Sequence, residues 1–170
     1  AGNVAIEFYQ TLGGAEGGWE EAREGMDRLV RAAPGNAGAA LALAKHLTYR
    51  EKTRRSGIRG LAALADDPGV GAEARAAWRE ALVWLNASPA DAPLLQAYLT
   101  ELGEDSELRG RLDQLSSQQT VSQQVTDRLD VGFEALEEEE LERAQAVFDR
   151  ALGRNANNVD ALVGLSSVAL

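Results

Sequence analysis

Hydrophobic side chains recur along this chain at the three- and four-residue spacing that is typical of amphipathic helices. In three segments a small residue is followed four positions later by a large apolar residue. A second apolar or small residue comes three positions after that, and then Pro or Asn. The segments are Ala22–Met26–Leu29–Pro34, Gly57–Leu61–Leu64–Pro68 and Ala144–Phe148–Ala151–Asn155.

The spacing between these segments indicates a repeat. Pro34 and Pro68 lie 34 residues apart, and a 34-residue period of helix-turn-helix units is typical of the tetratricopeptide repeat. In such a unit the small residue lets two helices approach, large residues fill the groove between them, and Pro or Asn ends the second helix. We therefore predict an all-α fold, a tetratricopeptide-repeat solenoid that forms a right-handed superhelix of about ten helices in antiparallel pairs. The residues that carry this packing are Ala22, Met26, Gly57, Leu61, Gly132, Ala144, Phe148 and Ala151.

The repeats are predicted to form two blocks. Residues 1–104 hold about three helix pairs, of which the third is degenerate, and residues 127–170 hold a second block that ends in a truncated repeat. Residues 105–126 are a non-repeat helical linker. Their polar stretch 116–124 is a candidate hinge, because it offers few apolar side chains for packing. A rigid helix through 105–136 is the alternative, since no proline interrupts it.

Composition narrows the functional classes. The chain has 27 Asp and Glu against 17 Lys and Arg, a net charge of −10, so nucleic acid is not expected as a partner. No apolar run is long enough to span a membrane. There is no cysteine and a single histidine, His46, for which we expect a packing role within a helix pair. No catalytic, metal-binding or cofactor-binding constellation stands out, and we expect neither a cofactor nor enzymatic activity.

One basic cluster, residues 50–59, stands out in this acidic chain. It is either a solvated corner paired with local acids or a contact point for a partner, because the arginine side chain offers a rigid fork of donors to hydroxyls and carboxylates. Trp84 is offset from the apolar face of its helix and is expected to be exposed. We expect Arg54 or Arg55 to be exposed too. The candidate partner or glycan contacts are Tyr49, Arg50, Arg54, Arg55 and Trp84.

Residues 41–64, 77–99 and 132–165 resemble the periplasmic tetratricopeptide-repeat region of the bacterial cellulose synthase operon protein C family. The most specific parts are 46–51, HLTYRE, and 78–98. In that family the repeats precede an outer-membrane exporter of the glucan. The resemblance implies a periplasmic scaffold that links synthase and exporter, within a full-length protein anchored in the outer membrane. Its implied partners are other subunits of the cellulose synthase complex or other periplasmic proteins.

Two other functions stay open. The first is a generic tetratricopeptide adaptor that binds peptides on its concave surface. Some adaptors of this class clamp the acidic C-terminus of a partner and need Lys and Asn on the concave surface. The acidic composition of this chain does not favour that type of site. The second is direct contact with cellulose or another β-glucan. It would need exposed aromatic side chains aligned on one surface, and aromatic residues make up only 5% of the chain.

Overall fold

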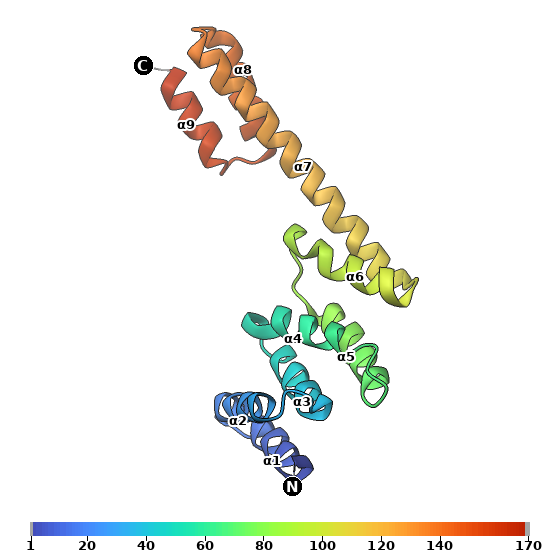
Figure 1. Ribbon diagram of the computed structural model, residues 1–170. Helices are drawn as coiled ribbons and strands as arrows, with labels where there is room; N and C mark the ends of the chain where they lie inside the picture. The colour runs from blue at the N-terminus through green and yellow to red at the C-terminus, as the bar shows by residue number, and fades with distance from the viewer. Residues whose placement is uncertain (1, 169–170) are drawn as a thin grey trace. The chain divides into compact units, whose positions relative to one another are not determined.

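The structure, a computed structural model, describes residues 2–168, without the side chains of residues 121, 122, 124, 125 and 127. Every regular element in that range is helical, as expected from the sequence (Figure 1). The helices are α1 (Gly2–Gly14), α2 (Trp19–Ala32), α3 (Ala37–Thr48), α4 (Glu51–Ala63), α5 (Gly71–Trp84), the 3-10 helix η1 (Pro89–Asp91), α6 (Ala92–Leu102), α7 (Ser106–Glu137), α8 (Leu141–Arg154) and α9 (Val159–Val168).

Side-chain caps fix where several helices begin. The Asn36 side chain accepts a hydrogen bond from the backbone N–H of Ala39 at 3.1 Å, just before α3. Asp105 caps α7 in the same way through Leu108, and Asn158 caps α9. Such caps satisfy backbone donors that the first turn of a helix leaves unpaired.

The chain forms two compact units, Ala1–Asp113 and Gln114–Leu170. In the first unit each helix from α1 to α5 packs against the next in sequence, and α3 also contacts α1 and α5. Ala22, Met26 and Leu61 are buried there, and Trp78 packs edge-on against Tyr98. The core of this unit therefore lies between consecutive helices.

Gly57 allows α3 and α4 to approach closely. A Cβ atom at this position would lie 2.7 Å from the carbonyl oxygen of Ala44 and 2.8 Å from Cγ2 of Thr48. Both distances are too short for ordinary contact. Gly57 is buried, so the small residue that the repeat pattern singled out lies where two helices meet.

The core of the second unit surrounds Phe148 of α8. Its ring is fully buried and lies between Gly132 of α7 and Gly164 of α9, where an added Cβ would come within 2.8 Å and 2.4 Å of it. Gly132, Ala144 and Ala151 are also buried. All eight residues expected to carry the repeat packing are thus buried in one unit or the other.

Helix α7 runs without interruption through the segment predicted as a linker. Its residues 116–120 are all exposed, and among the side chains that the structure describes here the nearest buried ones on the two sides are Leu115 and Leu129. The boundary between the compact units, at residues 113 and 114, falls within the predicted linker 105–126. The division into repeat blocks and the hinge itself stay predictions.

Candidate interaction surface

Two exposed aromatic rings lie side by side in the first unit. Tyr49 stands in the turn between α3 and α4, and Trp84 is the last residue of α5. Their ring centroids are 6.2 Å apart with the planes tilted by 35°. The Tyr49 residue is 63% exposed and Trp84 is 44% exposed. We refer to Tyr49 and Trp84 as the aromatic pair.

Arg54 of α4 lies beside this pair. Its guanidinium donates hydrogen bonds to backbone carbonyl oxygens at or next to the two aromatic residues. Its Nε donates to the carbonyl oxygen of Thr48 at 2.7 Å, and its Nη1 donates to that of Trp84 at 2.9 Å. The same Nη1 pairs with Glu51. Only 13% of the Arg54 side chain is exposed, so its donors are directed into the molecule.

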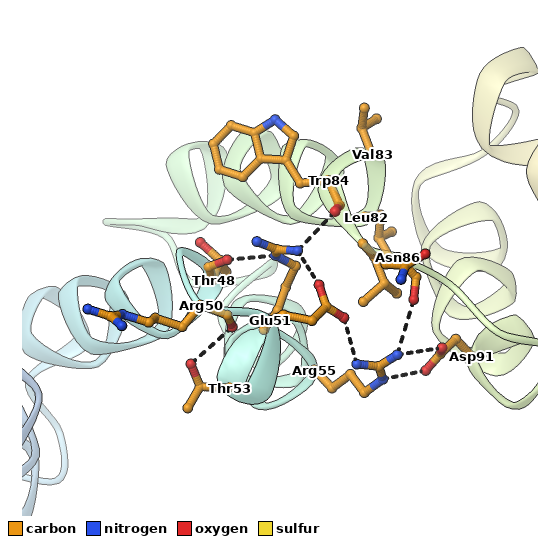
Figure 2. A network of polar contacts seen from close by, with 12 residues as sticks. Thr48, Arg50, Glu51, Thr53, Arg55, Leu82, Val83, Trp84, Asn86 and Asp91 are labelled. Atoms are coloured by element: carbon orange, nitrogen blue, oxygen red, sulfur yellow. Dashed lines mark hydrogen bonds and ion pairs between the residues drawn. The ribbon is translucent and has the colours of Figure 1, made fainter. Parts of the chain in front are cut away.

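Arg55 is joined to the segment that follows α5 (Figure 2). Its Nε and Nη2 donate to the two carboxylate oxygens of Asp91 at 2.8 Å and 2.9 Å. Nη1 donates to Glu51, and Nη2 also donates to the carbonyl oxygen of Asn86 at 3.3 Å. This hydrogen bonding lowers the pKa of Asp91 to about 2 and raises that of Arg55 above its ordinary value.

The expectation that Arg54 or Arg55 is exposed is wrong. The Arg54 side chain is 13% exposed and the Arg55 side chain 35% exposed, and both pair with acids and backbone carbonyls of their own unit. Pairing within the unit lets a partly buried guanidinium keep the hydrogen bonds that water would otherwise supply. Of the predicted contacts, the exposed ones are Tyr49, Arg50 and Trp84, and any contact with a partner stays a prediction.

Arg50 and His46 belong to a stack around Trp19. The Arg50 guanidinium lies 4.9 Å from the centroid of the Trp19 ring, an arrangement that favours a cation–π interaction. The His46 ring stacks on Trp19 at 4.9 Å, and its Nε2 lies 2.8 Å from the Trp19 carbonyl oxygen. His46 is buried, so the packing role expected for it is confirmed. Among the side chains that the structure describes, no cluster of His, Asp and Glu could hold a metal ion.

Lys45 of α3 lies at the meeting point of three hollows on the face formed by α1, α3 and α5. The largest is about 420 Å³ and is lined by Tyr49 together with residues of α1, α2 and α3. The Lys45 ammonium pairs with Glu73 of α5 at 2.6 Å. The surface beside the aromatic pair is therefore hollowed, and its lysine charge is balanced within the unit.

The sequence suggested Glu51 as an acid that could pair with the basic cluster, and it does pair with Arg54 and Arg55. The sequence did not indicate Asp91 and Arg111 as the other partners that organise this region. Ser88 and Asp91 did carry a local signal, because Ser followed three positions later by an acid is typical of a capping box. The structure contains that box: the Ser88 backbone N–H donates to Asp91 at 2.8 Å and its hydroxyl at 2.9 Å. Arg111 donates to the carbonyl oxygens of Leu82, Val83 and Leu85, a long-range contact without a sequence signal.

Across the described part of the chain, no helix combines the length and the apolar character needed to cross a membrane.

Nearly the whole chain aligns with proteins named cellulose synthase operon protein C. It is 45% identical over 172 positions to the one from Xanthomonas axonopodis pv. citri (strain 306), covering 99% of this chain and 11% of that protein. It is 38% identical to the one from Pseudomonas fluorescens (strain SBW25), covering 96% and 13%, and 39% identical to one from Komagataeibacter xylinus, covering 99% and 13%. The chain thus spans only 11–13% of the length of these relatives. No family model and no solved structure matches it.

Proposed function

Because the chain is homologous to a segment of cellulose synthase operon protein C, we propose that it is a tetratricopeptide-repeat scaffold of bacterial cellulose synthesis and export. In this proposal it is a non-catalytic interaction module. It lies in the periplasm, within a full-length protein anchored in the outer membrane, and links the synthase to the exporter. Its partners are other subunits of that machinery.

The alignment is the observation that carries the proposal. Three relatives from three genera bear the same name, and each aligns with at least 96% of this chain. The aligned positions, at 38–45% identity, extend over the helices of both units and are not confined to one short motif. A role in cellulose synthesis is therefore the function best supported for the segment.

Helix packing supports the repeat architecture. In a tetratricopeptide array the first helix of each pair also contacts the first helix of the next pair, which generates a continuous face for partners. In the first unit α3 contacts both α1 and α5, besides its neighbours in sequence. Small residues lie where the helices cross. In this unit Gly57 faces the backbone of Ala44, and in the other unit Gly132 and Gly164 face the ring of Phe148.

A crosslinking experiment tests the scaffold role. The chain replaces the matching segment of the full-length Komagataeibacter xylinus relative, with a photo-crosslinking amino acid at one exposed position, Gln10, Lys52 or Glu73. We expect crosslinks to identified subunits of the cellulose machinery from at least one of these positions in living cells. The matched control carries the same amino acid at Glu142, on an exposed position of α8. Crosslinks to such a subunit should be weaker or absent from the control. Absence of any such subunit at Gln10, Lys52 and Glu73, with normal protein levels, would contradict the proposal.

A further inference from the structure

We propose that the aromatic pair, Tyr49 and Trp84, is a binding platform for a segment of neutral β-glucan, and that Arg54 is a positioning residue for it. This inference rests on the proposed role in cellulose export and adds a specific ligand contact to it. The two rings come from different helix pairs of the first unit and lie 6.2 Å apart.

The chemistry of the rings suits a sugar. A pyranose ring in β-linkage has two faces of axial C–H groups and an equatorial rim of hydroxyls. The C–H groups pack on the electron-rich face of an aromatic ring, while the rim stays hydrogen-bonded to water or polar side chains. Both residues of the aromatic pair are exposed to solvent, Tyr49 more than Trp84. Two neighbouring rings can contact successive residues of one chain.

Charge in this region favours a neutral ligand over an anionic one. Three cations near the pair already have partners: Arg54 with Glu51, Arg55 with Asp91, and Lys45 with Glu73. The Arg50 guanidinium lies over Trp19. Lys52 and Arg50 are exposed, and no acid within the described range lies at ion-pair distance from either. An acidic polysaccharide or peptide that met them would still approach a chain with a net charge of −10.

The apolar area favours a glycan over a protein. Within the described residues of the first unit, the exposed large apolar side chains are Val4 and Phe8 on α1 and the aromatic pair itself. Around the pair the exposed neighbours Arg50, Lys52 and Asn86 are polar. A stable protein interface buries about 800 Å² on each partner around an apolar centre. Two aromatic rings surrounded by polar side chains do not supply an apolar centre of that size.

Arginines hold the backbone that carries Trp84. A helix leaves its last four carbonyl oxygens without partners within the helix. At the end of α5 those oxygens are taken by arginines from elsewhere: Arg111 binds residues 82, 83 and 85, and Arg54 binds Trp84 itself. Arg54 also binds Thr48, the residue before Tyr49. One side chain therefore links the backbone positions of both rings, and binding needs less ordering of the site.

The test is an NMR titration of the chain with cellohexaose, a soluble β-1,4-glucan. We expect saturable shifts of the Trp84 indole N–H and the Tyr49 amide. Trp84→Ala and Tyr49→Ala should each weaken binding by about tenfold or more, because each removes one stacking ring. Phe8→Ala, which removes an exposed aromatic ring on α1, should leave the affinity unchanged. No saturable shift, or equal affinity in Trp84→Ala, would overturn the platform.

Two comparisons define the ligand. Polygalacturonate, an acidic polymer, should bind more weakly than cellohexaose, and equal or tighter binding would overturn the choice of a neutral ligand. If cellohexaose does not bind and Trp84→Ala abolishes the crosslinks to a subunit, the aromatic pair is a protein contact and the glucan proposal fails. If cellohexaose does not bind and the crosslinks remain in Trp84→Ala, the aromatic pair is not a glucan platform, and the proposed scaffold role is unaffected.

Arg54→Ala tests the positioning role separately, because both rings remain. We expect weaker cellohexaose binding together with faster amide exchange at residues 84–86 and an unchanged circular dichroism spectrum. Arg54→Lys keeps the charge but not the two-directional fork, so it should not restore the affinity. Wild-type affinity in Arg54→Ala would show that Arg54 does not position the rings.

Discussion

Arg55 and Asp91, 36 residues apart in the sequence, form a two-pronged ion pair that joins α4 to the segment after α5 (Figure 2). The nitrogen–oxygen distances are 2.8 Å and 2.9 Å. Because Oδ2 of Asp91 also accepts both donors of Ser88, the carboxylate is held by two separate parts of the chain. The carboxylate is almost fully buried, so the stability of the first unit depends on its charge.

Acid should weaken this unit. The pKa of Asp91 is lowered from an ordinary value of 3.8 to about 2, chiefly by its hydrogen bonds to Arg55. A carboxyl group with a lowered folded pKa stabilises the fold above its ordinary pKa, and this contribution is lost as the pH falls towards 2. We therefore expect the free energy of unfolding to fall between about pH 4 and pH 2. Urea unfolding at a series of pH values measures it.

Asp91→Asn separates this pair from the other carboxylates. The variant should lose about 1–3 kcal/mol near neutral pH, because the donors of Arg55 and Ser88 lose a charged acceptor and an amide NH2 replaces one of its oxygens. Its unfolding free energy should also depend less on pH in the acid range. Asp66→Asn, at an exposed aspartate, is the control and should change neither quantity. A wild-type pH profile in Asp91→Asn would show that the pair does not control acid stability.

Gly57 and Gly110 should respond in opposite directions to substitution by alanine. A Cβ at Gly57 meets the Ala44 carbonyl oxygen at 2.7 Å, so α3 and α4 would have to separate, at a cost of about 1–3 kcal/mol. At Gly110, inside α7, nothing lies within 4 Å of an added Cβ. Alanine there should stabilise the chain by about 0.5–1 kcal/mol, through helix propensity and lower entropy of the unfolded chain. Thermal unfolding distinguishes the two, and equal effects would contradict the close crossing.

Ala144→Leu should overpack the second unit. Ala144 is fully buried in α8, in the same core as Phe148, and a larger side chain should cost about 1–3 kcal/mol. Ala146→Leu, at an exposed position of the same helix, serves as the matched control. A thermal midpoint that is unchanged in Ala144→Leu would mean that the repeat register assigned to this unit is incorrect.

Residues 116–124 should exchange amide hydrogens faster than the two ends of α7. The described side chains of this stretch are exposed, whereas Leu112 and Leu115 before it and Leu129 after it are buried. A helical segment with few packed apolar side chains opens at low free-energy cost. Hydrogen exchange followed by mass spectrometry tests this, and uniformly slow exchange across 106–137 would argue for a rigid helix without a hinge.

Much of the fold could be predicted because its determinants are local. Helix periodicity and the recurring small and large residues located the crossings at Ala22, Gly57 and Ala144, all of which are buried. The polar stretch and the absence of proline made an uninterrupted helix one of two expectations for 105–136, and α7 is continuous.

The arginine contacts could not be predicted in the same way. The basic cluster was compatible with a corner paired to local acids, yet exposure of Arg54 or Arg55 was expected. The outcome depended on acids and carbonyls that folding brings close. Arg54 reaches Trp84, 30 residues away, and Arg55 reaches Asp91. The exposure of Trp84 was predicted correctly. That prediction needed only the periodicity of one helix, because Trp84 lies off the apolar face formed by Trp78, Leu82 and Leu85.

Secreted cellulose in living cells tests the central claim most directly. In the Komagataeibacter xylinus relative, this chain replaces the matching segment, and the cellulose released into the medium is weighed. Deletion of the segment is the negative control, and the native protein is the positive one. We expect the chimera to secrete clearly more cellulose than the deletion strain, because the chain supplies the missing scaffold contacts. Secretion no higher than in the deletion strain, with the chimera present at native levels, would contradict the claim.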